Sequence, residues 1–391
     1  MAEYRYLIIG GGLTADAACK GIREHDPDGS IAVVGDEAYP PYLRPPLTKG
    51  LWSGEDEDTI WRGTADVGVD LQLGRTIVSL DLPDCQATDD QGETYAYERL
   101  LLATGGRPRR LPFGGDDVIY FRTLDDYRRL RSLAGDGTRV VVIGGGFIGS
   151  EIAASLATNG CAVTMVFPGH GIGARVFPAD LAGFVTGYYR DKGVEVIART
   201  SVTGIDRADG VSRVTTDDGR TLEADVVVAG LGIEPRTELA ASAGLPVEDG
   251  IIVDRHACVA GRVDVFAAGD VARFPAAILD ETMRVEHEDH AKSHGRLAGI
   301  NMAGAGEPYD YLPFFYSDLF DLGYEAVGDL DPHQETFAEW DDPNRKGIVY
   351  YLDPVRRPHG VLLWNVFGRV DEARELIRSH KPIEERSLSR P

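Results

Sequence analysis

The chain has 391 residues, enough for two or three domains, and 43% of them are hydrophobic, as in ordinary globular cores. The formal net charge of −23 opposes non-specific binding to nucleic acid or anionic membranes. No apolar run approaches the ~20 residues of a membrane span. The first strand begins near residue 4, which leaves no room for a signal peptide, so we expect a cytoplasmic protein.

The first predicted unit is a strand over residues 4–10, a glycine turn, and a helix from Thr14 to about His25. Gly10 and Gly12 take the first two positions of a G-x-G-x-x-G pattern, and Ala15 takes the third. The first glycine permits the tight turn, the second lets a pyrophosphate approach the backbone, and the third lets helix pack on strand. The helix N-terminus then presents unpaired N–H groups to the phosphates. This stretch predicts a dinucleotide site.

The next predicted strand, Ile31–Val34, ends at an acidic pair, Asp36 and Glu37. An acid at the end of the second strand of such a unit normally accepts hydrogen bonds from the adenosine ribose. Asp36 lies 36 − 10 = 26 residues after the first glycine, slightly beyond the usual spacing of about 20. Asp36 is therefore the first candidate and Glu37 the second, and an exposed loop acid is the alternative.

Two cations follow in the segment Tyr42–Lys49. Because its two prolines restrict the backbone, Arg44 and Lys49 are candidates for fixed rather than solvated side chains. Residues 76–104 alternate apolar and polar side chains in short runs, which predicts a β-meander that ends in a buried strand and a glycine turn at Gly105.

The composition then shifts to a Pro/Gly-rich connection at residues 111–115, where we place a domain boundary. Residues 123–134 are typical of an arginine-rich surface helix. A second strand–turn–helix unit follows, with glycines at Gly144, Gly146 and Gly149 and a helix to about Asn159. Two such glycine patterns in one chain indicate that the protein holds two dinucleotides at once.

The second unit lacks the acid that the first unit has. Its second strand, Ala162–Phe167, is followed by Pro168, Gly169 and His170, with Arg175 shortly after. Without a carboxylate to repel a 2′-phosphate, NADPH is not excluded, and His170 or Arg175 would favour it. The sequence leaves the choice between NADH and NADPH open.

The order of elements that follows the first glycine pattern recurs after the second glycine pattern. Residues 194–230 form another meander that ends in an apolar strand and a glycine at Gly232, which indicates an internal duplication. A further strand is predicted to begin at Val263 and to end before Gly269-Asp270. This strand would complete the sheet of the first unit. A helix opens near Glu286 and continues through Ile300. His287 and His290 allow a metal site, but a helix N-terminus with acids suited to its dipole is the favoured interpretation.

The last segment, residues 311–380, is rich in aromatic side chains. Two runs in it, Gly347–Leu352 and Gly360–Phe367, predict strands, and residues 370–379 predict a helix before a polar tail.

Taken together, these motifs resemble the flavoproteins of the pyridine nucleotide–disulfide oxidoreductase superfamily, nearest to apoptosis-inducing factor and the ferredoxin and rubredoxin reductases. The stretches that carry the resemblance are Pro41–Lys49, Gly144–Glu151, Arg284–Ala291, Tyr316–Leu319, Gly323–Ala326 and Leu363–Phe367. The resemblance implies an α/β fold with two Rossmann-like three-layer ββα domains and an α+β C-terminal domain. The expected boundaries are 1–111 and 237–310 for FAD, 112–236 for NAD(P)H and 311–391 for the C-terminal domain.

The resemblance also implies a set of FAD contacts. Asp270 would bond the ribityl–phosphate region, the helix beginning at Glu286-His287 would face the pyrimidine edge of the flavin, and Tyr316 replaces a family aromatic that is often Trp. The full expected FAD set is Gly10, Gly12, Leu13, Thr14, Ala15, Asp36, Glu37, Arg44, Lys49, Val78, Ala103, Thr104, Gly105, Arg122, Gly269, Asp270, Glu286, His287, Glu288 and Tyr316.

On the nicotinamide side, the resemblance implies contacts from Phe147 and Glu151, and it marks Gly169 as a departure where a ribose-binding acid is usual. The expected NADH or NADPH set is Gly144, Gly146, Phe147, Ile148, Gly149, Glu151, Arg175, Gly232, Glu325 and Asn365. A Lys49–Glu151 pair is the candidate catalytic pair, because a cation beside the flavin stabilises negative charge as hydride arrives. An ordinary structural ion pair between domains is the alternative.

The expected function is an FAD-dependent NAD(P)H oxidoreductase that passes electrons to a separate acceptor. Thiol–disulfide reductases need a C-x-x-C beside the flavin, and the four cysteines are far apart; peroxidase-type relatives need a cysteine in the segment that holds Arg44 and Lys49. A small iron–sulfur protein such as a ferredoxin or rubredoxin, a quinone and oxygen all remain candidate acceptors.

An acidic carrier would need a local basic patch, for which the candidates, or else a solvated face, are Arg107, Arg109, Arg110, Arg128, Arg129 and Arg131. The alternative function is a redox sensor like apoptosis-inducing factor, in which reduced flavin with bound NAD⁺ promotes a homodimer.

Overall fold

The computed structural model describes residues 2–383. The chain divides into two compact units. Within the described residues, unit 1 holds residues 2–43, Asp58–Arg107 and Glu234–Pro313, and unit 2 holds Arg44–Glu57, Pro108–Ile233 and residues 314–383. Within the part of the chain that the structure describes, no helix is long and apolar enough to cross a membrane.

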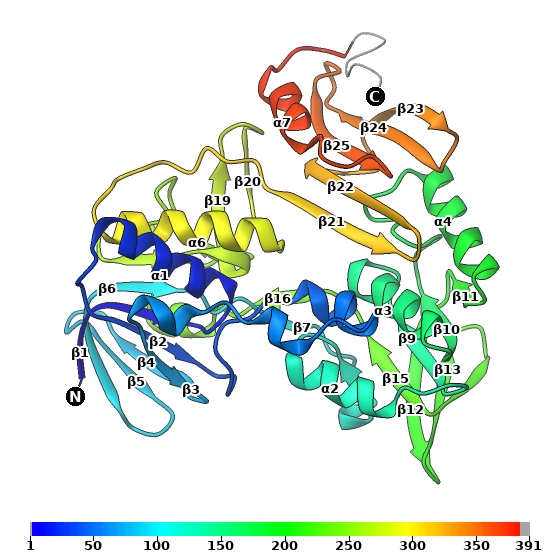
Figure 1. Cartoon of the computed structure of the whole chain (residues 1–391), viewed down its shortest axis with the longest axis horizontal. Coiled ribbons are helices and arrows are strands. Elements are labelled where there is room, and N and C mark those ends of the chain that lie inside the picture. Colours follow the sequence, from blue (N-terminus) through cyan, green and yellow to red (C-terminus); the bar gives the residue numbers. More distant parts are fainter. Residues whose placement is uncertain (1, 384–391) are drawn as a thin grey trace. The chain divides into compact units, whose positions relative to one another are not determined.

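Unit 1 is built on a seven-stranded sheet with strand order β3-β2-β1-β6-β5-β4, in which β18 pairs with the end of β6 (Figure 1). The four strands β3, β2, β1 and β6 run parallel, whereas β4, β5 and β6 form the predicted antiparallel meander. The strands are β1 Ala2–Ile9, β2 Ile31–Gly35, β3 Asp70–Leu73, β4 Ile77–Asp81, β5 Gln86–Asp89, β6 Thr94–Leu102 and β18 Val265–Ala267.

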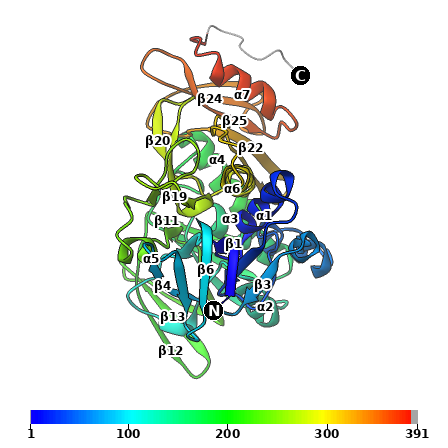
Figure 2. The same cartoon turned by 90° about the vertical axis from the view of Figure 1, so that its left-hand side faces the viewer.

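Two helices, α1 Leu13–His25 and α6 Glu288–Met302, lie side by side on this sheet, as both Figure 1 and Figure 2 show. Their backbones approach closely because Gly295 and Gly299 of α6 face α1. A Cβ at Gly295 would lie 2.5 Å from the Thr14 carbonyl oxygen, and one at Gly299 would lie 2.2 Å from that of Ala18. The smaller elements of this part of the chain are α5 Glu238–Ser242, β17 Ile251–Ile252, β19 Ala272–Ala276 and β20 Glu281–Met283, while β7 Gly106–Pro108 and β16 Ile233–Pro235 form a two-stranded sheet of their own.

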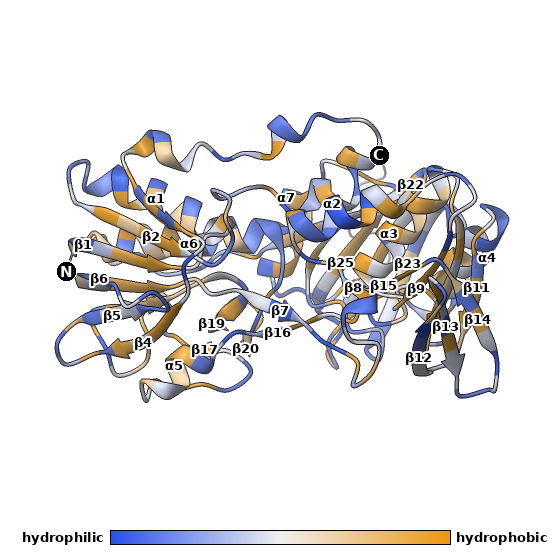
Figure 3. Ribbon diagram, turned by 90° about the horizontal axis from the view of Figure 1, so that it is seen from below, coloured by the Kyte–Doolittle hydropathy of each residue, from blue (hydrophilic) through white to orange (hydrophobic). Residues whose placement is uncertain are grey.

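Unit 2 contains a second parallel sheet, with strand order β11-β10-β9-β15-β8. Its strands are β8 Val118–Tyr120, β9 Arg139–Ile143, β10 Ala162–Phe167, β11 Glu195–Ala198 and β15 Val226–Ala229. Its helices are α2 Leu124–Leu133, α3 Phe147–Thr158 and α4 Ala179–Asp191, and an antiparallel meander adds β12 Val202–Ala208, β13 Val211–Thr216 and β14 Thr221–Ala224. Figure 3 colours the strands of both parallel sheets mainly as hydrophobic and α2 mainly as hydrophilic, as predicted for an arginine-rich surface helix.

The same unit holds an antiparallel sheet with strand order β21-β22-β25-β24-β23, against which α7 Val370–Arg378 packs. Its strands are β21 Phe314–Leu319, β22 Leu322–Gly328, β23 Glu335–Asp342, β24 Lys346–Leu352 and β25 Pro358–Trp364.

The sequence prediction of two strands in the last segment was incomplete. It missed β21, β22 and β23, because Gly323 and the charged side chains of β23 interrupt the apolar alternation. It also missed α4, which carries Gly183 and Gly187 in its interior and is held by burial of residues such as Leu181, Val185 and Tyr189 rather than by helix propensity.

Candidate functional site

The first glycine turn has the geometry of a phosphate cradle. Gly10 has φ +117°, and a Cβ there would lie 2.1 Å from the Ala103 carbonyl oxygen, so no other residue fits this turn. In contrast, a Cβ at Gly12 would meet nothing within 4 Å, which leaves open space in front of the start of α1. Leu13, Thr14 and Ala15 form the buried first turn of that helix. The residues present therefore fit a pyrophosphate at the helix N-terminus.

The second glycine turn has the same geometry. Gly144 has φ +122°, and a Cβ there would lie 2.3 Å from the Gly230 carbonyl oxygen. Gly146 again opens onto free space, while a Cβ at Gly149 would lie 2.2 Å from the Gly144 carbonyl oxygen. The third glycine is thus required for α3 to start this close to the turn, as its position in the motif predicts. Both cradles fit a dinucleotide.

The two acids after β2 are both engaged in unit 1. An Oδ2 oxygen of Asp36 lies 2.5 Å from the guanidinium of Arg236, a residue that no sequence motif singles out. Glu37 accepts a hydrogen bond of 2.5 Å from the Tyr42 hydroxyl. Thr104, which follows β6 beside Ala103 and Gly105, donates to the Arg236 carbonyl oxygen at 2.8 Å. Arg236 therefore connects the acid to the turn after β6.

The expected flavin residues around Asp270 lie between β18 and α6. Gly269 and Asp270 begin a 3-10 turn directly after β18, and Arg284 donates to the Asp270 carbonyl oxygen at 3.1 Å. His287 is the N-cap residue of α6, and burial lowers its pKa to about 4, so the imidazole is neutral at physiological pH. The N-terminus of α6 is then a source of positive potential that does not depend on a charged histidine.

Two acids flank His287 at the start of α6. Glu286 pairs with Arg284 at 2.6 Å, and Glu288 pairs with Lys292 one turn along the helix. Val78, expected near the adenine, lies in β4 with 56% of its surface exposed.

The Lys49–Glu151 pair forms within unit 2. Lys49 Nζ lies 2.5 Å from Glu151 Oε1, and the exposed fractions of the two side chains are 15% and 6%. Thr48 donates from Oγ1 to Glu151 Oε2 at 2.6 Å, and Ser317 donates from Oγ to Oε1 at 2.5 Å. Glu151 thus accepts from a cation and two hydroxyls, which fixes the ammonium position. Since both partners belong to unit 2, the pair is no bridge between units.

The loop that carries Lys49 is fixed from several sides. Residues Pro45–Thr48 and Gly50–Trp52 form two short 3-10 turns, as expected from the proline pair. Ser155 of α3 donates to the Thr48 carbonyl oxygen at 2.7 Å, and Asn159, the C-cap residue of α3, donates to the Trp52 carbonyl oxygen at 3.2 Å. Trp52 in turn donates from its indole nitrogen to the Leu47 carbonyl oxygen at 2.8 Å.

Two further expected flavin residues contact this loop within unit 2. The Lys49 ammonium lies 5.3 Å from the ring centroid of Tyr316 in β21, within range of a cation–π interaction. Arg44 donates from Nη1 to the Arg122 carbonyl oxygen at 2.9 Å. The structure therefore brings Arg44, Lys49, Arg122 and Tyr316 into one unit with Glu151.

The expected nicotinamide residues lie at the start of α3 and in the antiparallel sheet. Phe147 and Ile148 are partly exposed, and the Phe147 ring packs edge-on against Phe315 at 5.4 Å. Gly232 accepts a hydrogen bond from the Arg109 amide, and Arg175 lies in the turn after β10.

Two residues of the antiparallel sheet expected near the nicotinamide have structural partners. Asn365 accepts from the Gly323 amide at 2.7 Å and donates to the Arg345 carbonyl oxygen at 2.7 Å, and Glu325 accepts from the Gly368 amide at 2.9 Å. These hydrogen bonds fix the end of β25. The contacts of Asn365 and Glu325 with a nicotinamide remain predictions.

The structure places His290 in a buried pair with His294 on α6, a pairing that the sequence motif did not indicate. His290 and His294 are fully buried, and their rings pack against each other and against Phe274 and Tyr309. His290 Nδ1 lies 3.0 Å from the Tyr309 hydroxyl, and burial lowers the pKa of both histidines, that of His294 to about 3. Within residues 2–383, no group of three or more histidine, cysteine or acidic side chains is arranged to hold a metal.

The cysteines do not supply redox chemistry through a disulfide. All four are free thiols, and burial raises the pKa of Cys19 to about 12 and that of Cys258 to about 11. A raised pKa keeps the thiol protonated and therefore a poor nucleophile.

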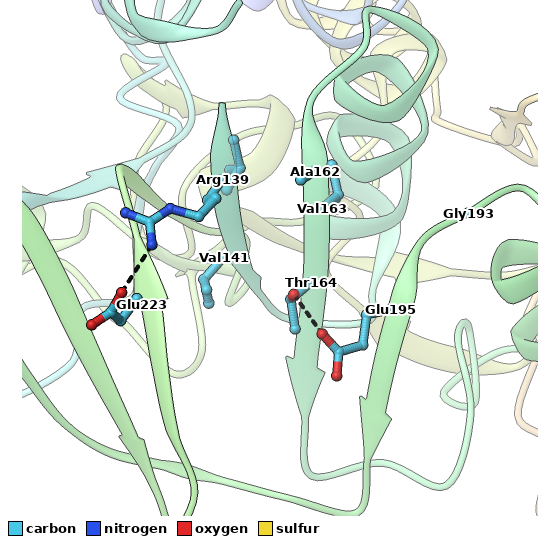
Figure 4. A pocket seen from close by; sticks show the side chains of 9 residues that line it. Arg139, Val141, Ala162, Val163, Thr164, Gly193, Glu195 and Glu223 are labelled. Carbon is cyan, nitrogen blue, oxygen red and sulfur yellow. Dashed lines mark hydrogen bonds and ion pairs between the residues drawn. The ribbon is translucent and has the colours of Figure 1, made fainter. Parts of the chain in front are cut away.

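A separate hollow of about 260 Å³ lies at the amino ends of β9, β10 and β11, away from the glycine turn (Figure 4). Its charged groups are paired: Arg139 with Glu223 at 3.0 Å, and Glu195 with the Thr164 hydroxyl at 3.0 Å. Nothing in it converges on a ligand, so it is not part of the site.

A match to a known protein family covers most of the chain. The model of the pyridine nucleotide-disulphide oxidoreductase family matches residues 4–295. The chain belongs to this family. It is thus a member of an NAD(P)H-dependent flavin oxidoreductase family, and the predicted fold class and resemblance are confirmed.

Members of the family with curated names are similar over most of the chain. The chain is 34% identical to the mitochondrial apoptosis-inducing factor 1 of Dictyostelium discoideum, over 98% of this chain and 80% of that protein. It is 36% identical to monodehydroascorbate reductase 3 of Arabidopsis thaliana, over 90% of this chain and 88% of that protein.

Solved structures of two reductases match over almost the whole chain. Putidaredoxin reductase, in a covalent complex with putidaredoxin, matches with a TM-score of 0.90 and 29% identity over 98% of this chain and 95% of that chain. A ferredoxin reductase from Rhodopseudomonas palustris matches with a TM-score of 0.90 and 30% identity over 97% of this chain and 95% of that one.

Proposed function

We propose that this protein is an FAD-dependent NAD(P)H oxidoreductase that delivers electrons to a separate small iron–sulfur protein. The observation that carries the proposal is the pair of glycine cradles together with the buried Lys49–Glu151 pair, in a chain whose described cysteines are all free thiols. The whole-length likeness to two reductases of iron–sulfur carriers supports this choice of acceptor.

A bound flavin would supply the chemistry of hydride acceptance and of single-electron release. The protein itself supplies positive charge and holds that charge in a fixed position. The Lys49 ammonium, fixed by Glu151, Thr48 and Ser317, stabilises negative charge that develops on the acceptor ring. Within unit 1, the N-terminus of α6 carries fixed positive potential while His287 stays neutral.

Anaerobic stopped-flow mixing of the FAD-loaded protein with NADH or NADPH tests the first half of the proposal. We expect bleaching of the flavin band, followed by rapid reoxidation when a [2Fe–2S] ferredoxin is added. A protein that binds no flavin on reconstitution, or whose flavin ignores both nucleotides, would refute the proposed activity. Reoxidation by a quinone but not by ferredoxin would refute the choice of acceptor alone.

The second candidate function is a redox sensor, favoured by the 34% identity to an apoptosis-inducing factor over 98% of the chain. A sensor would keep a long-lived charge-transfer band of reduced flavin and NAD⁺ in air and would shift to a dimer on reduction. Size-exclusion chromatography of oxidised and reduced protein, together with the decay of that band, separates the two functions.

At least four of the six arginines proposed for docking a carrier have local partners. In unit 2, Arg128 pairs with Glu57, Arg129 donates to the Asp116 carbonyl oxygen at 2.7 Å, and Arg131 lies 5.2 Å from the Trp52 ring. In unit 1, Arg107 pairs with Glu234 at 2.6 Å. Raising the salt concentration should slow ferredoxin reduction but not dye reduction if these exposed guanidinium groups still steer the carrier.

A further inference from the structure

The tip of β10 in unit 2 carries cations where an acid is expected. We propose that this site selects NADPH over NADH and that Arg199 contacts the 2′-phosphate, an inference that rests on the proposed NAD(P)H oxidoreductase activity. In a Rossmann-like unit, an acid at this tip hydrogen-bonds the ribose 2′-hydroxyl of NAD, whereas an arginine accommodates the 2′-phosphate of NADP.

Arg199 is distant from Gly169 in sequence but lies beside it in the fold. Strands β10 and β11 pair in parallel, with Phe167 opposite Ala198. Beyond the strands the Thr200 amide donates to the Phe167 carbonyl oxygen at 3.1 Å, and the Arg199 amide donates to the Gly169 carbonyl oxygen at 2.9 Å. These two bonds hold Arg199 at φ +57°, a conformation that few non-glycine residues adopt, so its backbone position is fixed by the tip itself.

A second arginine is held near the same tip. The Gly173 amide donates to the Gly145 carbonyl oxygen within the glycine fingerprint at 2.8 Å, and the Phe177 amide closes the turn on the Gly173 carbonyl oxygen at 2.8 Å. Arg175 lies in this turn, so its backbone is attached to the cradle that receives the pyrophosphate.

Neither arginine is neutralised. Within the residues that the structure describes, neither the Arg175 nor the Arg199 guanidinium has an ion-pair partner within 4.0 Å, and both side chains are exposed. His170, next to Gly169, is exposed as well and adds a hydrogen-bond donor. By contrast, Arg139 in β9 of the same sheet is paired with two acids. The two arginines at the tip are therefore free to meet an anion.

The missing acid is not imposed by the backbone. Gly169 does not adopt a positive φ, and a Cβ there would have its nearest contacts at 3.7 Å from the Gly171 carbonyl oxygen and 3.8 Å from the Phe167 ring. These are ordinary van der Waals distances, so the backbone accommodates a Cβ at this position. The absence of a carboxylate is therefore a property of the site chemistry rather than of the turn.

The test compares kcat/KM for flavin reduction by NADPH and by NADH in the FAD-loaded protein. We expect kcat/KM to be higher for NADPH than for NADH. Arg199→Ala should lower the ratio of these two kcat/KM values by about tenfold or more, as expected when a hydrogen bond to a charged group is lost. Gly169→Glu should invert the ratio, whereas Gly169→Gln, of equal size but uncharged, should change it much less. Arg213→Ala, which removes an exposed arginine of β13, is the matched control and should leave the ratio unchanged.

Binding of adenosine 2′,5′-bisphosphate and of AMP, followed by calorimetry, gives a readout that needs no turnover. The bisphosphate should bind more tightly than AMP, and Arg199→Ala should remove the difference. A protein that oxidises NADH as well as NADPH, with a ratio insensitive to Arg199→Ala, overturns this inference and leaves the proposed function intact. A protein that oxidises neither nucleotide overturns the proposed function instead.

Discussion

The two glycine cradles are alike in backbone and differ in the residues directly after their second strands. Gly10 and Gly144 have φ values of +117° and +122°, and an added Cβ would lie 2.1 and 2.3 Å from the carbonyl oxygen of the neighbouring strand end. After β2, however, the chain has Asp36 and Glu37, whereas after β10 it has Gly169 and His170. The backbone of each turn therefore fits a dinucleotide, and under the proposed function the residues at the strand tip select which dinucleotide binds.

Substituting the first glycine of each turn tests the two cradles separately. Gly10→Ala should abolish FAD binding, because the methyl group overlaps the Ala103 carbonyl oxygen in a conformation that alanine rarely adopts. Gly144→Ala should leave FAD bound but abolish reduction by NAD(P)H. Flavin absorbance of the purified variants and anaerobic reduction measure the two effects.

The control for this pair is Gly183→Ala in α4, where an added Cβ meets nothing within 4 Å and the helix gains about 1 kcal/mol of stability. A yellow Gly10→Ala protein that is reduced at the normal rate would show that the close carbonyl contact is unimportant.

The second prediction concerns the buried carboxylates of the two cradle helices. In α1, Asp16 binds Lys20 at 2.8 Å, Arg62 at 3.0 Å and Thr64 at 2.8 Å, a wholly structural set. In α3, Glu151 holds Lys49. Lys49→Ala should slow flavin reduction by about 100-fold at unchanged FAD content, as for loss of one charge-stabilising donor.

Two variants sharpen that comparison. Asp16→Asn should lower the free energy of unfolding by about 3 kcal/mol, because the cations lose their buried partner, but should not slow reduction per bound flavin. Ser317→Ala should slow reduction less than Lys49→Ala, because it removes one hydroxyl that orients Glu151. Equal reduction rates in Lys49→Ala and wild type would make the α3 pair structural as well.

The third prediction separates Asp36 from its partner. If Asp36 bonds the adenosine ribose, Asp36→Ala should raise the Kd for FAD by about tenfold. Arg236→Ala should raise it much less, since an exposed ion pair contributes about 0–1 kcal/mol. Equal losses in the two variants would mean that Asp36 acts only through Arg236 and would transfer the ribose role to Glu37.

The parts of the fold that the sequence predicted are those governed by local pattern. Glycine spacing located both turns, and apolar runs located the parallel strands β1, β2, β9, β10 and β15, since each signal lies within about ten residues. The parallel strands β3 and β8 were not predicted. Arg199 and Arg236 were missed because their neighbours Gly169 and Asp36 are distant in the chain and meet only through strand order. Ser317 was missed for the same reason, because its link to Glu151 depends on packing of β21 near α3.

The smallest predicted effect distinguishes the two units by pH. In unit 1, His290 and His294 are buried on α6, whereas the described histidines of unit 2 are exposed or only partly buried. Burial lowers the pKa of His294 to about 3 from the ordinary 6.5. Between these values the unfolded chain binds a proton that native His294 does not, so this residue alone lowers the free energy of unfolding by about 1.4 kcal/mol for each pH unit below 6.5.

Hydrogen exchange of α6 amides at pH 7.5 and 5.5 measures this acid lability, after correction for the intrinsic exchange rate. His294→Asn keeps an acceptor for the Gly269 amide but does not titrate, so α6 should lose about 1.4 kcal/mol less protection than in wild type over that interval. His170→Asn, at the exposed tip of β10, is the matched control and should not alter the loss. If wild type and His294→Asn lose equal protection, the histidine is not held neutral by burial, and acid sensitivity does not distinguish the two units.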